Sequence, residues 1–132
     1  MHPETQSALR AVGCWLLEVG DASRAMRVLA GLVALDASDT EAARALAQAA
    51  LRCGQWERAA RVAAHCAQLA RAAGRLDAEA HVLVARALLG AGRRAEALGW
   101  LRAALDPGAG VLDGDAARHV RMARSLLALV SR

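Results

Sequence analysis

A repeated arrangement of glycine and alanine constrains the fold of this chain more than any other feature. Gly20, Gly54 and Gly92 each close a helical run, and an alanine follows each of them five residues later. These alanines are Ala25, Ala59 and Ala97. Gly20 and Gly54 lie 34 residues apart, and Gly54 and Gly92 lie 38 apart, which is the same period with a four-residue insertion. The pattern predicts a stack of three two-helix units.

Each part of the repeated unit has a physical reason. A glycine ends the first helix of a hairpin because the left-handed backbone conformation is cheap only for glycine. An alanine lies where two helices cross closely and a larger side chain would push them apart. A period of 34 residues is that of the tetratricopeptide repeat (TPR). We therefore expect an all-α fold, with three TPR-like helical hairpins forming a short right-handed solenoid and a C-terminal capping helix.

Capping residues place the helix boundaries. Asp21 is a candidate cap for the second helix, Ser38 to Glu41 reads as a capping box for the third, and Asp77 is a candidate cap for the fifth. Asp106-Pro107-Gly108 ends the sixth helix, because proline cannot continue one. We predict a single domain over 1–132, with repeats at about 6–38, 39–74 and 77–108, a linker at 109–114 and a cap helix at about 115–130.

The last predicted helix has two different faces. Val120, Ala123, Leu127 and Val130 share one face, and arginines occupy the other. Repeat stacks need an end cap with a polar outer face, and this helix fits that role. The alternative is a basic amphipathic helix for a membrane surface, which the absence of tryptophan from this helix disfavours.

The composition favours helix and says little about nucleic acid. Alanine, the best helix former, makes up roughly a quarter of the chain. The formal charge is +4, and all 17 basic residues are arginine. Arginine suits phosphate or carboxylate recognition, but the joint absence of Lys, Asn, Ile, Phe and Tyr favours the codon bias of a GC-rich genome. Nucleic-acid binding therefore stays a weak alternative, and we expect no nucleic-acid partner.

No arrangement of residues indicates catalysis, a metal or a cofactor. Cys14, Cys53 and Cys66 are odd in number and lie within helical patterns, so they read as small apolar residues of a reducing cytosol. The four histidines are scattered without a metal-binding spacing. Residues 1–10 lack the apolar stretch of a signal peptide, and no apolar run reaches the ~20 residues of a membrane span. We expect a cytoplasmic, non-enzymatic protein without membrane insertion.

The first helices of the three hairpins are expected to line an inner groove. Leucine occupies the twelfth position of every repeat, at Leu17, Leu51 and Leu89, and predicts an apolar rail along that groove. Arginines at other inner positions flank it. The predicted groove residues are Arg10, Cys14, Leu17, Arg44, Gln48, Leu51, Arg52, Val82, Arg86 and Leu89. The thirteenth position, also inward, holds Glu18, Arg52 and Gly90.

Two interpretations of the rail remain open. Each leucine buried in a partner would contribute about 1.5–3 kcal/mol, enough for three to hold an amphipathic helix or an extended segment. Alternatively, the leucines pack on neighbouring helices or on the end cap. On the groove interpretation, Leu51→Glu abolishes partner binding and leaves helicity unchanged. A carboxylate clamp of the kind that grips chaperone C-termini is disfavoured, because it relies on lysine and asparagine.

The three tryptophans receive different predictions. Trp56 follows the turn at Gly54-Gln55, where this repeat often has an aromatic residue in the hairpin corner, and we expect it in the core. Trp100 is expected to pack on the final helix. Trp15 is either a core residue or part of an interface, where an exposed tryptophan would be a candidate hot spot.

The first hairpin carries a family likeness. It runs Gly13-Cys14-Trp15-Leu16-Leu17-Glu18-Val19-Gly20, followed by Ala25-Met26-Arg27-Val28-Leu29 and a Leu35-Asp36 ending. Over roughly residues 9–60 it resembles the small TPR chaperones of bacterial type III secretion, and most of all their YscY-like members. Cys14 stands between the Gly and Trp of that family's Gly-Trp-Leu motif, and the proline usual after Asp36 is missing.

The resemblance implies a chaperone without cofactor or chemistry. Such a protein would hold a small secreted YscX-like partner in the bacterial cytosol and help present it to the export gate. Relatives in the same system chaperone needle subunits or translocators with the same repeat. A generic TPR adaptor or assembly scaffold, and a homodimer formed through the first hairpin when the client is absent, stay open as alternatives.

Overall fold

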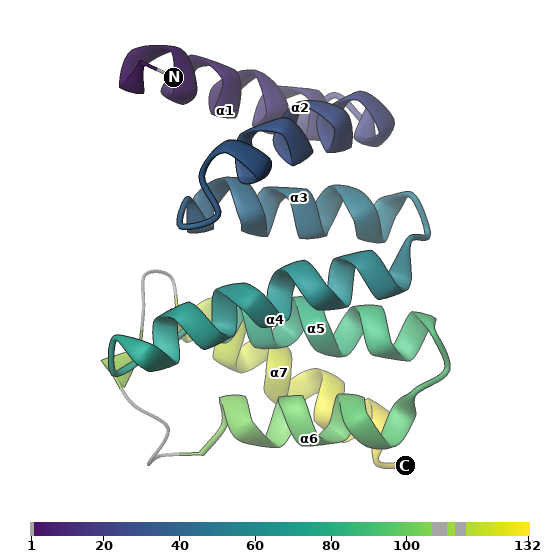
Figure 1. Ribbon diagram of the computed structural model, residues 1–132. Coiled ribbons are helices and arrows are strands. Elements are labelled where there is room, and N and C mark those ends of the chain that lie inside the picture. The colour runs from purple at the N-terminus through teal and green to yellow at the C-terminus, as the bar shows by residue number, and fades with distance from the viewer. Residues whose placement is uncertain (1, 107–110, 113–115) are drawn as a thin grey trace.

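The computed structural model describes residues 2–106, 111–112 and 116–132, and in this part of the chain seven helices form an elongated stack (Figure 1). The termini lie at opposite ends of the stack. The helices are α1 (Pro3–Glu18), α2 (Ala22–Leu35), α3 (Thr40–Arg52), α4 (Trp56–Ala72), α5 (Ala78–Gly90), α6 (Arg94–Ala104) and α7 (Ala116–Val130). Two short strands, β1 (Arg75–Leu76) and β2 (Val111–Leu112), complete the fold.

The packing follows the predicted order of hairpins. α1 packs on α2, α3 on α4 and α5 on α6, while α2 meets α3 and α4 meets α5 between successive hairpins. α7 packs against both helices of the last hairpin, where a fourth repeat would begin. The all-α TPR-like prediction is therefore confirmed, including the capping position of the final helix.

Glycine and aspartate define the helix ends as expected. Gly20, Gly54 and Gly92 have φ values of +90°, +72° and +78°, the left-handed region that favours glycine. Asp21 and Asp77 accept hydrogen bonds from backbone N–H groups three residues later and cap α2 and α5. The predicted capping box before α3 is wrong.

Asp39 is the residue that caps α3. Its Oδ1 accepts a hydrogen bond from the Ala42 N–H at 3.1 Å, so the helix begins at Thr40. Ser38, the expected cap, instead donates its hydroxyl to Asp36 at the end of the preceding helix. A hydroxyl competes poorly with a carboxylate one residue further on, because the carboxylate also interacts with the positive end of the helix dipole.

Small residues let the helices cross closely. Ala25, Ala59 and Ala97, the alanines of the repeat, are all fully buried. Gly13 lies directly under the buried Leu29 side chain, and a Cβ added at Gly13 would come within 2.7 Å of it. Close packing of the core therefore depends on glycine and alanine at defined positions as much as on large side chains.

A small sheet that the sequence does not predict joins the segments before and after the third repeat. Arg75 and Leu76 pair in parallel with Val111 and Leu112, so the turn before α5 and the segment before α7 form a small two-stranded sheet. α6 ends at Ala104, before the predicted Asp106-Pro107-Gly108 stop, of which Pro107 and Gly108 lie outside the described residues. Residues 109–110 and 113–115 also lie outside them.

α7 has the predicted apolar face. Ala123 is buried and Leu127 packs against the core, whereas Arg118, Arg121 and Arg124 are exposed. Arg94, the first residue of α6, donates hydrogen bonds to the Val130 carbonyl and, at 3.3 Å, to the Arg132 carbonyl. These bonds satisfy carbonyl groups that a helix end leaves unpaired. Within the described residues, every helix is too short or too polar to cross a bilayer.

Candidate functional site

Arg10 and Arg44, two of the predicted groove cations, hold successive repeats together. Arg10 pairs with Asp39 at 3.1 Å and with Glu41 at 3.4 Å, both in the next repeat. Arg44 stands 34 residues later and pairs in the same way, with Asp77 at 2.7 Å and Glu79 at 3.5 Å. Each aspartate therefore caps a helix with one oxygen and receives the preceding repeat's arginine with the other.

The pKa values agree with a structural role for these ion pairs. Partial burial would raise the pKa of Asp39, but hydrogen bonds from the Ala42 N–H, Gln6 and Arg10 lower it below its ordinary value. Burial likewise would lower the pKa of Arg44, and Asp77 outweighs that effect and raises it. Both groups stay charged at neutral pH, and their charges are already matched.

The predicted leucine rail is mostly inside the protein. Leu17 is 5% exposed and Leu51 is 7% exposed, and both belong to the core. Val82, another predicted groove residue, is 2% exposed. Only Leu89 is half-buried. The open rail is corrected to packing between helices, because α1, which carries Leu17, packs on α2 and α3, and α3, which carries Leu51, packs on α1, α2, α4 and α5.

Four predicted groove residues nevertheless meet in one place. Leu51, Arg52, Arg86 and Leu89 line a hollow of about 310 Å³ between the C-terminal ends of α3 and α5. Trp56 and Gly90 complete it. We call this site the Trp56 hollow. Its volume is suited to one or two apolar side chains of a partner and is at the small end for a pocket that encloses a ligand.

Trp56 contradicts its predicted place in the core. Its side chain is 37% exposed, and its ring lies on the backbone of Gly90, where a Cβ would come within 2.6 Å of the ring atoms. The other repeats carry Glu18 and Arg52 at the position of Gly90, whose turn already has its own glycine at Gly92. This additional glycine is the signal in the sequence that marks where the Trp56 ring lies.

The rim of the Trp56 hollow is positively charged. Arg52 is exposed and donates a hydrogen bond of 2.7 Å to the Leu17 carbonyl, which ties the rim to the end of α1. Arg86 is exposed and has no ion-pair or hydrogen-bond partner among the described residues. None of the lining residues is acidic. The hollow can therefore receive an apolar side chain while Arg86 donates to a carbonyl or carboxylate beside it.

The remaining predicted site residues lie elsewhere on the first-helix side. Gln48 is half-buried in α3. Cys14 is half-buried in α1, and its burial, with Glu41 nearby, raises the pKa of its thiol. Burial raises the pKa of Cys66 to about 11, so neither thiol is an activated nucleophile. No cluster of potential metal ligands occurs within residues 2–106, 111–112 and 116–132.

Trp15 lies on the surface of the protein. It is 58% exposed on α1, with Val12 exposed on the same helix and Val19 exposed at the C-cap of that helix, at spacings of three and four. This spacing places all three on one face. We call this face the α1 stripe, and the interface prediction for Trp15 remains a prediction.

Comparison with protein-family models finds no match to this sequence, and comparison with curated proteins finds none either. Solved structures do match. PcrH in complex with the chaperone-binding region of PopD is similar with a TM-score of 0.82 and 18% identity, over 99% of this chain and 94% of PcrH. The translocator chaperone SycD of Yersinia enterocolitica is similar with a TM-score of 0.81 and 19% identity, over 99% of this chain and 86% of SycD.

TPR domains outside secretion systems are also similar. The second TPR domain of human RPAP3, solved in complex with an HSP70 peptide, has a TM-score of 0.69 and 18% identity, over 93% of this chain and 98% of that domain. At identities below one fifth, these likenesses establish the fold, which is a TPR-like helical stack over nearly the whole chain.

Proposed function

We propose that this chain is a non-enzymatic chaperone of a bacterial type III secretion system, which holds a secreted protein in the cytosol before export. The observation that carries the proposal is the likeness in fold to PcrH and SycD, which extends over 99% of the chain and includes the final helix. The sequence of roughly residues 9–60, which begins in the first hairpin, supports it independently through its resemblance to secretion chaperones.

The Trp56 hollow is the proposed seat of the client. An apolar side chain of the client enters between Trp56 and Leu89, and Arg86 donates to a client carbonyl or carboxylate at the rim. Burying one leucine-sized side chain there stabilises the complex by about 1.5–3 kcal/mol. One such anchor suits a segment that must later be released.

Two kinds of client are compatible with this site. The resemblance of the first hairpin favours a small YscX-like secreted protein, presented to the export gate. The likeness in fold to SycD, a type III secretion translocator chaperone, favours a translocator. Both kinds of client would bind at the Trp56 hollow.

Co-expression tests the function. The chain is produced alone and with the small open reading frames that flank its gene, and the mass of each purified product is measured. We expect self-association or aggregation when it is alone, through the exposed α1 stripe, and a soluble heterodimer with the client. An unchanged monomer under both conditions would contradict the proposal, and a folded, non-secreted partner would indicate an adaptor instead.

A further inference from the structure

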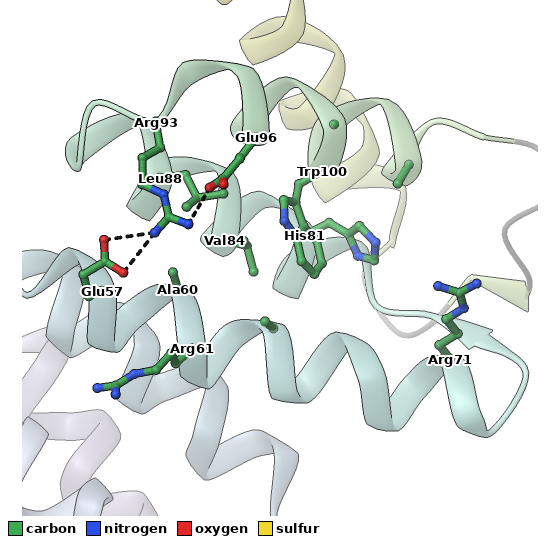
Figure 2. A pocket seen from close by; sticks show the side chains of 13 residues that line it. Glu57, Ala60, Arg61, Arg71, His81, Val84, Leu88, Arg93, Glu96 and Trp100 are labelled. Carbon is green, nitrogen blue, oxygen red and sulfur yellow. Dashed lines mark hydrogen bonds and ion pairs between the residues drawn. The ribbon is translucent and has the colours of Figure 1, made fainter.

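A second and larger hollow lies between α4 and α6, and residues of α5 also line it (Figure 2). Its volume is about 720 Å³, and nothing in the proposed function uses it. Its apolar lining comes from Ala60, Ala64, Val84, Leu88, Trp100 and Ala103. We call it the Trp100 hollow.

The hollow continues along α4. A neighbouring hollow of about 580 Å³ shares Arg71, His81, Trp100 and Ala103 with it, so the two form one trough. From Glu57 to Arg71 the trough follows about 21 Å of α4, at 1.5 Å per residue. The residues facing it from the two flanking helices include Ala60, Ala64 and Gly99, which leave room for another backbone to approach.

The charged residues that line the trough include more arginines than acids: Arg61, Arg71, Arg75 and Arg93 against Glu57, Glu96 and Asp106. At one end, Arg93 pairs with Glu57 at 3.0 Å and with Glu96 at 2.6 Å, and Figure 2 shows these three side chains in contact. Arg61 and Arg71, further along α4, are exposed and have no ion-pair or hydrogen-bond partner among the described residues. They are ten residues apart, which is about 15 Å along the helix axis.

His81, a residue with a polar ring, lines both parts of the trough. Nδ1 of His81 lies 2.8 Å from the Asp77 carbonyl, which can only accept, so Nδ1 carries the proton. In the neutral ring Nε2 is therefore an acceptor. The ring stands edge-on to Trp100, with centroids 5.2 Å apart, and both residues line both parts of the trough.

We propose that this trough binds an acidic amphipathic α-helix of a protein partner. The partner's apolar face enters between α4 and α6, and its carboxylates, about three turns apart, meet Arg61 and Arg71. A helix suits the site because the trough follows about four turns of α4 and is bounded by two helices, which fits the helix-in-groove mode of recognition. The site shares no lining residue with the Trp56 hollow, so the client and this partner would occupy separate sites.

Peptide display on the intact chain tests the proposal. A library of 18-residue amphipathic helices, varied on the apolar face and its flanks, is selected against the wild-type protein, and enriched peptides are measured by fluorescence anisotropy. We compare wild type with Ala64→Glu, which places a carboxylate in the trough, and with the double variant Arg61→Glu/Arg71→Glu. Arg86→Glu, in the other hollow, is a single charge-reversal control, and circular dichroism checks the fold of every variant.

The expected peptides carry Asp or Glu ten or eleven residues apart beside an apolar stripe. Ala64→Glu and the double variant each weaken their binding at least tenfold, while Arg86→Glu changes it less than twofold. Enrichment of neutral or basic peptides, equal binding to the trough variants, or no enrichment over Ala64→Glu would overturn the proposal. A doubling of the protein's own mass that Ala64→Glu abolishes would identify a second copy as the occupant, and would overturn it too.

Discussion

Each of the two hollows contains a tryptophan, and the two rings differ in the residues that they contact. Trp56 lies on the bare backbone of Gly90 and stays more than one third exposed. Trp100 is half-buried, stands against the imidazole of His81 and packs on the core. The Trp56 ring lies on a glycine and stays accessible to a partner. The Trp100 ring is held in the fold by its contacts with other side chains. The Trp56 ring is therefore held mainly by one glycine, whereas the Trp100 ring is fixed by side-chain contacts and forms part of the wall of its hollow.

Removing each ring tests this comparison and has the largest expected effect. Trp100→Ala should lower the free energy of unfolding by about 2–4 kcal/mol, because it leaves a cavity against the core. Trp56→Ala should lower it by about 1 kcal/mol or less, because its ring is already partly hydrated. Urea unfolding of both variants measures the difference. Equal losses would mean that Trp56 is a core residue after all.

A second difference separates arginines that join repeats from those that face solvent. Asp39→Asn keeps the helix cap but removes the ion pair with Arg10, and should cost about 1–2 kcal/mol at pH 7. The pKa of native Asp39 lies below its ordinary 3.8. Its contribution is therefore complete above that value and disappears as the pH falls through the native pKa.

Urea unfolding between pH 7 and pH 3 should show the Asp39→Asn deficit shrinking in the acidic range. Arg86→Gln, which breaks no described contact, is the control and should stay within about 0.5 kcal/mol of wild type throughout. A deficit independent of pH would point to lost capping in place of a lost charge pair.

The smallest expected effect concerns two glycines, one in each hollow. Gly99 in α6 has open space where a Cβ would be, so Gly99→Ala should stabilise the protein by about 0.5–1 kcal/mol through helix propensity. Gly90→Ala should fail to show this gain, because the new methyl group pushes the Trp56 ring from its seat. Thermal unfolding measures the stabilities, and a red shift of tryptophan fluorescence in Gly90→Ala alone reports the displaced ring.

The sequence predicted the local features well because they have local causes. A glycine at a turn and an aspartate before a helix act through their own backbone, so Gly20, Gly54, Gly92, Asp21 and Asp77 behave as expected. Position in the repeat also located Leu51, Arg52, Arg86 and Leu89, which do share one hollow.

Exposure was harder to predict because it depends on neighbours from other repeats. Leu17 and Leu51 occupy the expected helix face, yet the adjacent hairpins cover them. Arg10 and Arg44 face acids that lie 29 and 33 residues further on. Because Leu51 is in the core, Leu51→Glu would bury a charge and unfold the protein, so it does not isolate binding as the sequence alone suggested.

The most direct test of the account measures client affinity in the two tryptophan variants. The co-purified client is labelled and titrated with wild type, Trp56→Ala and Trp100→Ala under conditions where circular dichroism shows all three folded. Trp56→Ala should weaken binding at least tenfold, as expected for the loss of a hot-spot aromatic residue, and Trp100→Ala should change it less than twofold. Unchanged affinity in Trp56→Ala, or a larger loss in Trp100→Ala, would contradict the assignment of the Trp56 hollow as the client's seat.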